Sequence, residues 1–216
     1  MSAIAAPVDF ERVVDYRKLI AARPDRVRFI DIPACRQFAV DGAGPPGGPA
    51  FQAAFGALYP VAYTVHFALK RRGDEAPVGG IEGLFWLEDT ETIVPDLFAT
   101  GSAEGRTWLW SLRLPVPDQA TDDDIGTAIA EVARKKNPPA LADLHVVSWT
   151  EGPSAQILHV GPYSAEPPTI ERLHAAISAA ELRPRGRHHE IYISDPNRTP
   201  SDRLKTVIRQ PVEPSA

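Results

Sequence analysis

The same order of predicted elements occurs twice along the 216 residues of this chain. In each half a hairpin leads through a Gly/Pro loop into a helix, and two further strands follow. Residues 37–42 and 156–161 mark this step in the two halves, each ending a strand at the loop. Such self-similarity indicates an internal duplication. It predicts a single α+β domain over residues 1–216, with an antiparallel sheet, helices on one side and the other side free to bind a ligand.

The expected pseudo-repeats cover about 26–115 and 144–212, after an N-terminal arm at 1–25. Turns at Pro33-Ala34 and at Glu151-Gly152-Pro153 are expected to close the two hairpins. The strands expected in the first repeat are 27–32, 37–41, 79–87 and 107–114, and those in the second are 144–148, 156–160, 188–194 and 206–210.

Three long helices are expected, besides a short turn of helix at 200–204 and a helix or docking arm at 9–22. The first begins at Pro49 and runs towards Lys70, and Pro60 inside it predicts a kink or a break because proline lacks a backbone donor. The second covers 122–135, with an acidic start and a basic end that suit the helix dipole. The third covers 167–180, with apolar residues at helical spacing.

The strand at 188–194 carries two kinds of face. Its side chains alternate, so His189 and Ile191 share one face while His188, Glu190 and Tyr192 share the other. The apolar face is expected to pack against helices. The opposite face, with a carboxylate between an imidazole and a phenol, is expected to be solvated or to line a pocket.

Large aromatic and acidic side chains also gather on elements of the first repeat. Trp108 and Trp110 share a strand face, and Glu82 and Trp86 share another. Helical spacing places further aromatic side chains, Tyr59, Tyr63 and His66, in one stripe. Large aromatics usually fill a core, but a carboxylate is seldom buried unless it is paired or functional. An aromatic box with one or two acids suits a flat, partly cationic organic ligand.

Composition excludes several function classes. A net charge of −5 argues against broad nucleic-acid binding, and the single cysteine, Cys35, excludes an internal disulfide and a cysteine-rich zinc site. No apolar run spans a bilayer and no secretory signal is evident, so a cytoplasmic protein without membrane contact is expected. No metal is expected, because His188 and His189 point to opposite sides of a strand and the other histidines lack zinc spacing. Neither a Gly-x-Ser-x-Gly elbow nor a phosphate-loop lysine is present.

The chain resembles the stand-alone GyrI-like small-molecule-binding proteins, which share a duplicated strand–helix–strand–strand fold with the effector-binding domains of multidrug-sensing regulators. The segments that carry the resemblance are PAFQAAFGALYPVAYTVHFALK (49–70), IEGLFW (81–86), TWLWSL (107–112), ILHVGPYSAEPPTIERLH (157–174) and HHEIYISDPNRTPSDRLKTVIRQPV (188–212). The resemblance implies a ligand cleft between the two halves, with an acidic residue that maps onto Glu190. Lysine is expected in relatives where this chain has His66. No DNA-binding helix-turn-helix segment precedes the domain in this sequence, so a whole transcription factor is not expected.

Some members of this group hydrolyse the cyclopropane of DNA-alkylating antibiotics of the duocarmycin type, and others only bind drugs. The resemblance therefore implies a protein that binds flat aromatic xenobiotics and opens a strained ring, without a cofactor. The alternative is a non-catalytic drug-sequestering or gyrase-inhibitor-like protein. The catalytic residues expected in this cleft are Glu190, Glu82, Tyr63 and Tyr192, and the ligand-binding residues are Trp86, Trp108, Trp110, Tyr59, His66, Phe55 and His188. Glu82 and Glu190 are expected to face each other there, and one of them is expected to stay protonated.

Overall fold

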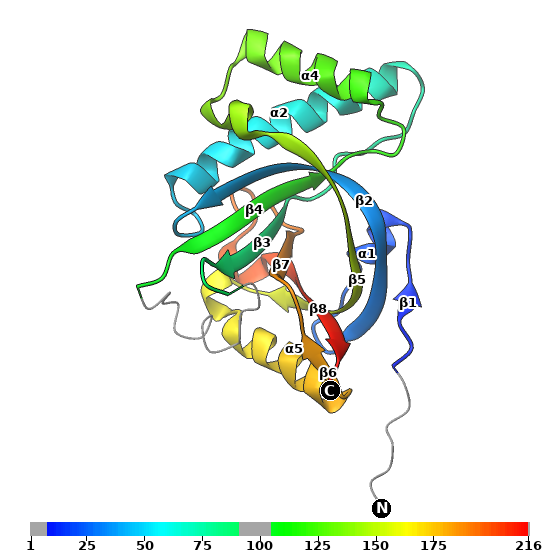
Figure 1. Ribbon diagram of the computed structural model, residues 1–216, viewed down its shortest axis with the longest axis vertical. Coiled ribbons are helices and arrows are strands. Elements are labelled where there is room, and N and C mark those ends of the chain that lie inside the picture. Colours follow the sequence, from blue (N-terminus) through cyan, green and yellow to red (C-terminus); the bar gives the residue numbers. More distant parts are fainter. Residues whose placement is uncertain (1–7, 91–104, 216) are drawn as a thin grey trace, which may run out of the picture. The chain divides into compact units, whose positions relative to one another are not determined.

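A computed structural model of the chain describes residues 8–90 and 105–215. These residues form two compact units. Unit 1 contains residues 8–34, 85–90, 105–106 and 150–215, and unit 2 contains residues 35–84 and 107–149. Antiparallel strands and packed helices make up both units, as expected for an α+β protein (Figure 1). Within the described part of the chain, no helix combines the length and apolarity needed to cross a membrane.

Unit 2 is built around the long helix α2 (Pro49–Arg71). Gly48 is its N-cap and Pro49 takes the first helical position, as the sequence predicts. A kink or a break was expected at Pro60; the helix continues through it, with buried side chains such as Leu58 and Val61 on both sides, so the break does not occur and the kink stays a prediction. Strand β4 (Trp108–Pro115) pairs antiparallel with residues 37–43 of β2 (Arg28–Ala43).

Helix α4 (Asp122–Lys135) packs beside α2 in the same unit (Figure 1). Thr121 and Asp124 form a capping box at its start, since the backbone amide of Asp124 donates to the Thr121 hydroxyl and the Asp124 carboxylate accepts from the Thr121 amide. The predicted helix at 122–135 is therefore confirmed. A short 3-10 helix, η1 (Pro139–Asp143), follows it.

Unit 1 contains the antiparallel strands β7 (His188–Tyr192), β8 (Lys205–Pro214) and the end of β5 (His145–Val160). Helix α5 (Pro167–Ala179) packs on this sheet and buries Ile170 and Leu173, as its apolar spacing predicts. The smaller elements of unit 1 are β1 (Glu11–Arg12), α1 (Tyr16–Leu19), η2 (Tyr163–Ala165), β6 (Leu182–Pro184) and η3 (Ser201–Arg203). Strand β3 (Glu82–Leu87) contains residues of both units.

The two predicted hairpins are wrong. Strand β2 runs unbroken through Pro33-Ala34, and β5 runs unbroken through Glu151-Gly152-Pro153. Both sites lie where the chain passes from one unit to the other, at residues 34–35 and 149–150. In β2, the residues before this point pair with β1 and those after it pair with β4. The turn-forming residues therefore mark a change of neighbouring strand rather than a reversal of the chain.

The side of β7 that faces α5 also differs from the expectation. Glu190 lies opposite Ile208, which in turn lies opposite Ile157, and paired residues share one face of a sheet. Ile157 and Ile208 pack in one cluster with Leu173 of α5. Glu190 therefore projects from the helix-covered face, and the helix was expected on the face of His189 and Ile191. Both faces of β7 are buried, which is why the polarity of the strand does not identify its helical side.

Candidate functional site

The side chains of His188, Glu190 and Tyr192 project from β7 on the face that α5 covers. The hydroxyl of Tyr192 donates a 2.8 Å hydrogen bond to Oε2 of Glu190. Nε2 of His188 lies 3.3 Å from Oε1 of the same carboxylate. His188 is fully buried, whereas the Glu190 side chain keeps 10% of its surface exposed. The three side chains that the sequence places on one face of the strand thus contact one another, and their predicted roles in catalysis and ligand binding stay predictions.

A second carboxyl lies beside Glu190, and the sequence prediction missed it. Glu166 directly precedes α5 and is only 5% exposed. Burial, reinforced by the negative charge of Glu190, raises the pKa of Glu166 far above its usual range. Glu166 therefore holds a proton at neutral pH, beside the carboxylate of Glu190.

Two tyrosines border this carboxyl pair. The rings of Tyr163 and Tyr192 meet edge to face, with 5.7 Å between their centroids. Burial and the charge of Glu190 raise the pKa of both phenols, so both remain hydrogen-bond donors at neutral pH. Tyr192 is partly buried, but Tyr163 is 41% exposed. The phenol of Tyr163 thus lies where solvent reaches the pair.

Helix α5 contributes one more imidazole to this face. Burial, together with the charge of His188, lowers the pKa of His174 to about 4. His174 is therefore neutral at physiological pH, and it adds no positive charge to the surroundings of Glu190.

Trp86, a predicted ligand-binding residue, belongs to unit 1. The guanidinium carbon of Arg187 lies 3.6 Å from the centroid of the Trp86 ring, a cation–π contact. Both side chains are partly exposed. One face of the indole is thus covered by a cation from the loop that leads into β7.

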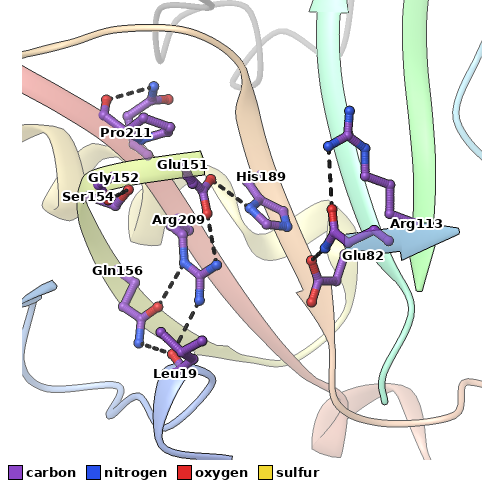
Figure 2. A network of polar contacts seen from close by, with 12 residues as sticks. Leu19, Glu82, Arg113, Glu151, Gly152, Ser154, Gln156, His189, Arg209 and Pro211 are labelled. Atoms are coloured by element: carbon purple, nitrogen blue, oxygen red, sulfur yellow. Dashed lines mark hydrogen bonds and ion pairs between the residues drawn. The ribbon is translucent and has the colours of Figure 1, made fainter. Parts of the chain in front are cut away.

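The opposite face of β7 carries a separate, buried ionic network. Figure 2 shows the Glu151 carboxylate between His189 and Arg209, at 2.8 Å from Nδ1 of His189 and 3.0 Å from Nη1 of Arg209. Arg209 also donates to Gln156 and to the carbonyl of Leu19. Burial alone would raise the pKa of Glu151, but the charges of His189 and Arg209 lower it to about 2. The Glu151 carboxylate is thus paired with two basic side chains, as expected for a structural network.

Glu82, predicted as a catalytic residue, lies in unit 2 and is 3% exposed. Its Oε2 accepts a 2.7 Å hydrogen bond from the amide of Gln37. Arg113 donates to Ser111 and to the other end of the Gln37 amide, and its guanidinium lies 4.6 Å from the Trp149 ring centroid. Glu82 and Glu190 belong to different units, so their predicted apposition stays a prediction.

The tryptophans of β4 differ in their surroundings. Trp110 is 1% exposed and its ring meets Phe51 of α2 edge to face, at 5.2 Å between centroids. It lies directly across from Gly42 of β2. Trp108, the other predicted ligand-binding residue of this strand, is partly exposed. Trp110 thus fills the core between α2 and β4, and its predicted role in ligand binding stays a prediction.

The aromatic stripe of α2 is present, and it also includes the rings of Phe55 and Phe67. Rings follow each other at Phe55, Tyr59, Tyr63 and Phe67, with centroids 6.2–6.3 Å apart. Tyr59 and Tyr63 line a groove beside α4, and Tyr63 is 47% exposed. The Nδ1 atom of His66 lies 2.6 Å from the carbonyl oxygen of Ala76. The predicted roles of these residues in the site of Glu190 join two units and remain predictions.

The sequence carried a signal for the missed residues. Gly161-Pro162 ends β5, and Tyr163 and Glu166 follow directly before the N-terminus of α5. Both residues lie inside a segment that carries the family resemblance, 157–174. A carboxylate just before a helix is usually explained by the helix dipole, so the position of Glu166 in the sequence does not by itself predict that it lies beside Glu190.

Comparisons with known proteins agree with this fold. The family model of the GyrI-like small-molecule-binding domain matches residues 68–213. The structure of an uncharacterized conserved protein from Listeria innocua is 29% identical, covers 92% of this chain and 97% of that chain, and superposes with a TM-score of 0.80.

Two structures of a hydrolase from the same organism are also similar. One is 30% identical, with 91% of this chain and 96% of that chain covered and a TM-score of 0.73. The other is 29% identical, with 95% and 100% covered and a TM-score of 0.74. Among curated proteins, none matches the chain. The family match extends over most of the sequence, and the chain belongs to the GyrI-like small-molecule-binding domain family.

Proposed function

We propose that this protein binds flat, hydrophobic aromatic compounds and detoxifies them by hydrolytic opening of a strained cyclopropane ring. The observation that carries the proposal is the pair of buried carboxyls, Glu190 and Glu166, with the Tyr192 hydroxyl bonded to Glu190. Two neighbouring carboxyls, one of which keeps its proton at neutral pH, are the arrangement that hydrolytic enzymes use for paired acid and base catalysis. Relatives of about 30% identity that are named hydrolases support the same reaction class.

Glu190 is the base in this proposal. Its carboxylate takes a proton from water while the water oxygen bonds to the unsubstituted carbon of the cyclopropane. The strained carbon–carbon bond breaks, and its electron pair moves through the conjugated ring to the carbonyl oxygen, which becomes a phenolate. The Tyr192 hydrogen bond fixes the orientation of the carboxylate, and the exposed tenth of the Glu190 side chain admits the water.

Glu166 is the acid. Its proton is available at neutral pH because burial and the charge of Glu190 oppose ionisation. Donation of this proton to the developing phenolate completes the product, a phenol that carries a hydroxymethyl group. Glu190 then holds the proton from water, and transfer of that proton to the neighbouring Glu166 restores the starting state of the pair.

Two partly exposed aromatic side chains of unit 1, Tyr163 and Trp86, support the proposal that the protein binds flat ligands. Tyr163 offers a 41% exposed phenol next to the pair, and Trp86 offers an indole whose electron density already attracts the Arg187 guanidinium. Rings of this kind stack on planar ligands at little entropic cost. Tyr63 has no part in the proposed mechanism, because its side chain lines the groove beside α4.

The test is turnover of a spirocyclopropylcyclohexadienone, followed by loss of the dienone absorbance and by mass change of one water. Wild type should convert the compound, and Glu190→Gln and Glu166→Gln should each lower kcat by about 10²- to 10⁴-fold. Glu171→Gln, which changes an exposed carboxylate of the same helix α5, is the matched control and should retain the wild-type rate.

Full activity of Glu190→Gln would remove Glu190 from the mechanism. Quenching of tryptophan fluorescence by the compound, with the compound recovered unchanged after long incubation with wild type, would instead establish the non-catalytic alternative, a drug-sequestering protein.

A further inference from the structure

Helices α2 and α4 of unit 2 enclose an open groove of about 580 Å³ that the proposed reaction does not use. Its volume lies within the range of small-molecule sites. Its lining residues are Tyr59, Pro60, Tyr63, Thr64, Phe67 and Arg71 of α2, and Glu131, Val132, Lys135 and Lys136 at the end of α4.

One wall of the groove is a ladder of aromatic rings. Tyr59, Tyr63 and Phe67 follow each other at four-residue intervals, and successive rings are nearly parallel, with interplanar angles of 28° and 27° and centroids 6.2 Å apart. Tyr63 is 47% exposed and Phe67 is 51% exposed. Large aromatic side chains so exposed on one helix provide flat apolar surface for a planar ligand.

The groove also carries positive charge, from Arg71 of α2 and from the end of α4. Arg71, Lys135 and Lys136 contribute three cations, and all three residues are exposed. Glu131 is the single acidic residue of the lining, and its carboxylate is bonded to Lys135 with 2.5 Å between Oε1 and Nζ. The lining thus carries a net charge of about +2, in a protein whose overall charge is −5. The last turn of α4 adds the negative end of its dipole, which the two lysines offset.

We infer that this groove is a second ligand site, which binds planar aromatic anions such as aryl sulfonates or aryl carboxylates. The ring system lies against the face of Tyr63 and Phe67, and the acid group lies at Lys135 and Lys136. The two contacts need a ligand with one flat apolar end and one anionic end. A neutral or cationic aromatic compound gains only the first contact and meets repulsion or no attraction at the second.

The test uses naphthalene-2-sulfonate and, as a probe of the same ring and opposite charge, 2-naphthyltrimethylammonium, each titrated by calorimetry at low salt. The sulfonate should bind at least 10-fold more tightly than the cation, and added salt should weaken it. The double variant Lys135→Gln/Lys136→Gln should weaken the sulfonate at least 10-fold, and Tyr63→Ala at least 5-fold. The control Lys18→Gln/Arg198→Gln changes net charge equally at exposed sites of unit 1 and should change affinity less than 2-fold.

Equal affinity for the two probes, or wild-type affinity in Lys135→Gln/Lys136→Gln, would overturn the inference. The inference would also be overturned if sedimentation showed that the wild type is a dimer and that Tyr63→Ala is a monomer. A second copy of the chain would then fill the groove. None of these outcomes depends on Glu190 or on turnover, so the groove and the hydrolytic proposal can fail separately.

Discussion

The imidazoles of His188 and His189 project from opposite faces of β7, and each approaches the carboxylate of a different glutamate. His188 lies 3.3 Å from Glu190, and His189 lies 2.8 Å from Glu151. Two adjacent residues thus serve two networks of different character. One network contains the carboxyl pair Glu190 and Glu166, and the other holds Glu151 between His189 and Arg209.

The network around Glu151 predicts loss of stability in acid. The folded state lowers the pKa of Glu151 from its usual 4.5 to about 2. The ionised Glu151 therefore contributes its full share to the free energy of unfolding above pH 4.5, and this contribution is lost as pH falls towards 2. The free energy of unfolding should fall by roughly 3 kcal/mol from this group over that window. Urea titrations of wild type and Glu151→Gln at several pH values measure it, and the variant should show the smaller fall. If the variant does not fold, NMR titration of the Glu151 carboxyl carbon in wild type supplies the same test, and a midpoint near 4.5 would contradict the prediction.

The carboxyl pair predicts the opposite dependence on pH. Glu166 has a raised pKa in the folded state, so the folded protein holds its proton more tightly than the unfolded chain does. The contribution of Glu166 to the free energy of unfolding is therefore fully present below pH 4.5 and is lost as pH rises towards that raised pKa. The loss amounts to as much as about 1.4 kcal/mol per pH unit. Glutamine mimics the protonated acid without a proton to lose. Glu166→Gln should therefore match wild type near pH 4.5 and exceed it in unfolding free energy at pH 8. If the unfolding free energies of Glu166→Gln and wild type differ by the same amount at pH 4.5 and at pH 8, this explanation is wrong. Glu171→Gln, which changes an exposed carboxylate of α5, is the control.

The sequence predicts most of the elements of this fold but not how they are joined. Apolar spacing located α2, α4 and α5, because each buries one stripe of side chains. The hairpins failed because proline and glycine were expected to reverse the chain. In the structure Pro33 lies within β2 and Gly152 lies within β5, and each of these strands begins in one unit and ends in the other. Local residue preference cannot show whether a strand turns back or changes its neighbour.

The site was predicted in the same partial way. Alternation along β7 grouped His188, Glu190 and Tyr192 correctly, since period-2 geometry follows from the backbone alone. It could not show which face α5 covers, because both faces of β7 are buried. Glu166 was missed because its contact with Glu190 depends on where α5 begins relative to β7, which is a matter of tertiary packing.

The hydrogen bond from Tyr192 to Glu190 predicts a defect in turnover with little defect in binding. Tyr192→Phe keeps the ring and its edge-to-face contact with Tyr163 but removes the hydroxyl that orients the carboxylate. Because Glu190 acts on water and does not hold the aromatic ligand, kcat should fall about 10-fold while KM stays within about 2-fold. Steady-state kinetics with the cyclopropane substrate measure both constants. A raised KM at unchanged kcat would show that Tyr192 binds the ligand instead.

The contact between Gly42 and Trp110 predicts a strong steric effect in unit 2. A Cβ atom at Gly42 would lie 2.2 Å from two carbons of the Trp110 ring, and that ring is fixed against Phe51. Gly42→Ala should therefore destabilise the protein by about 1–3 kcal/mol. Gly56→Ala is the matched control, since nothing lies within 4 Å of a Cβ at Gly56 in the middle of α2, and it should stabilise by about 0.5–1 kcal/mol.

Adding Trp110→Leu should make Gly42→Ala nearly neutral, because the smaller side chain frees the space. Urea unfolding of the four members of this cycle measures the coupling between the two sites. If Gly42→Ala costs as much beside Leu as beside Trp, the cost arises from the backbone of β2 and not from the indole.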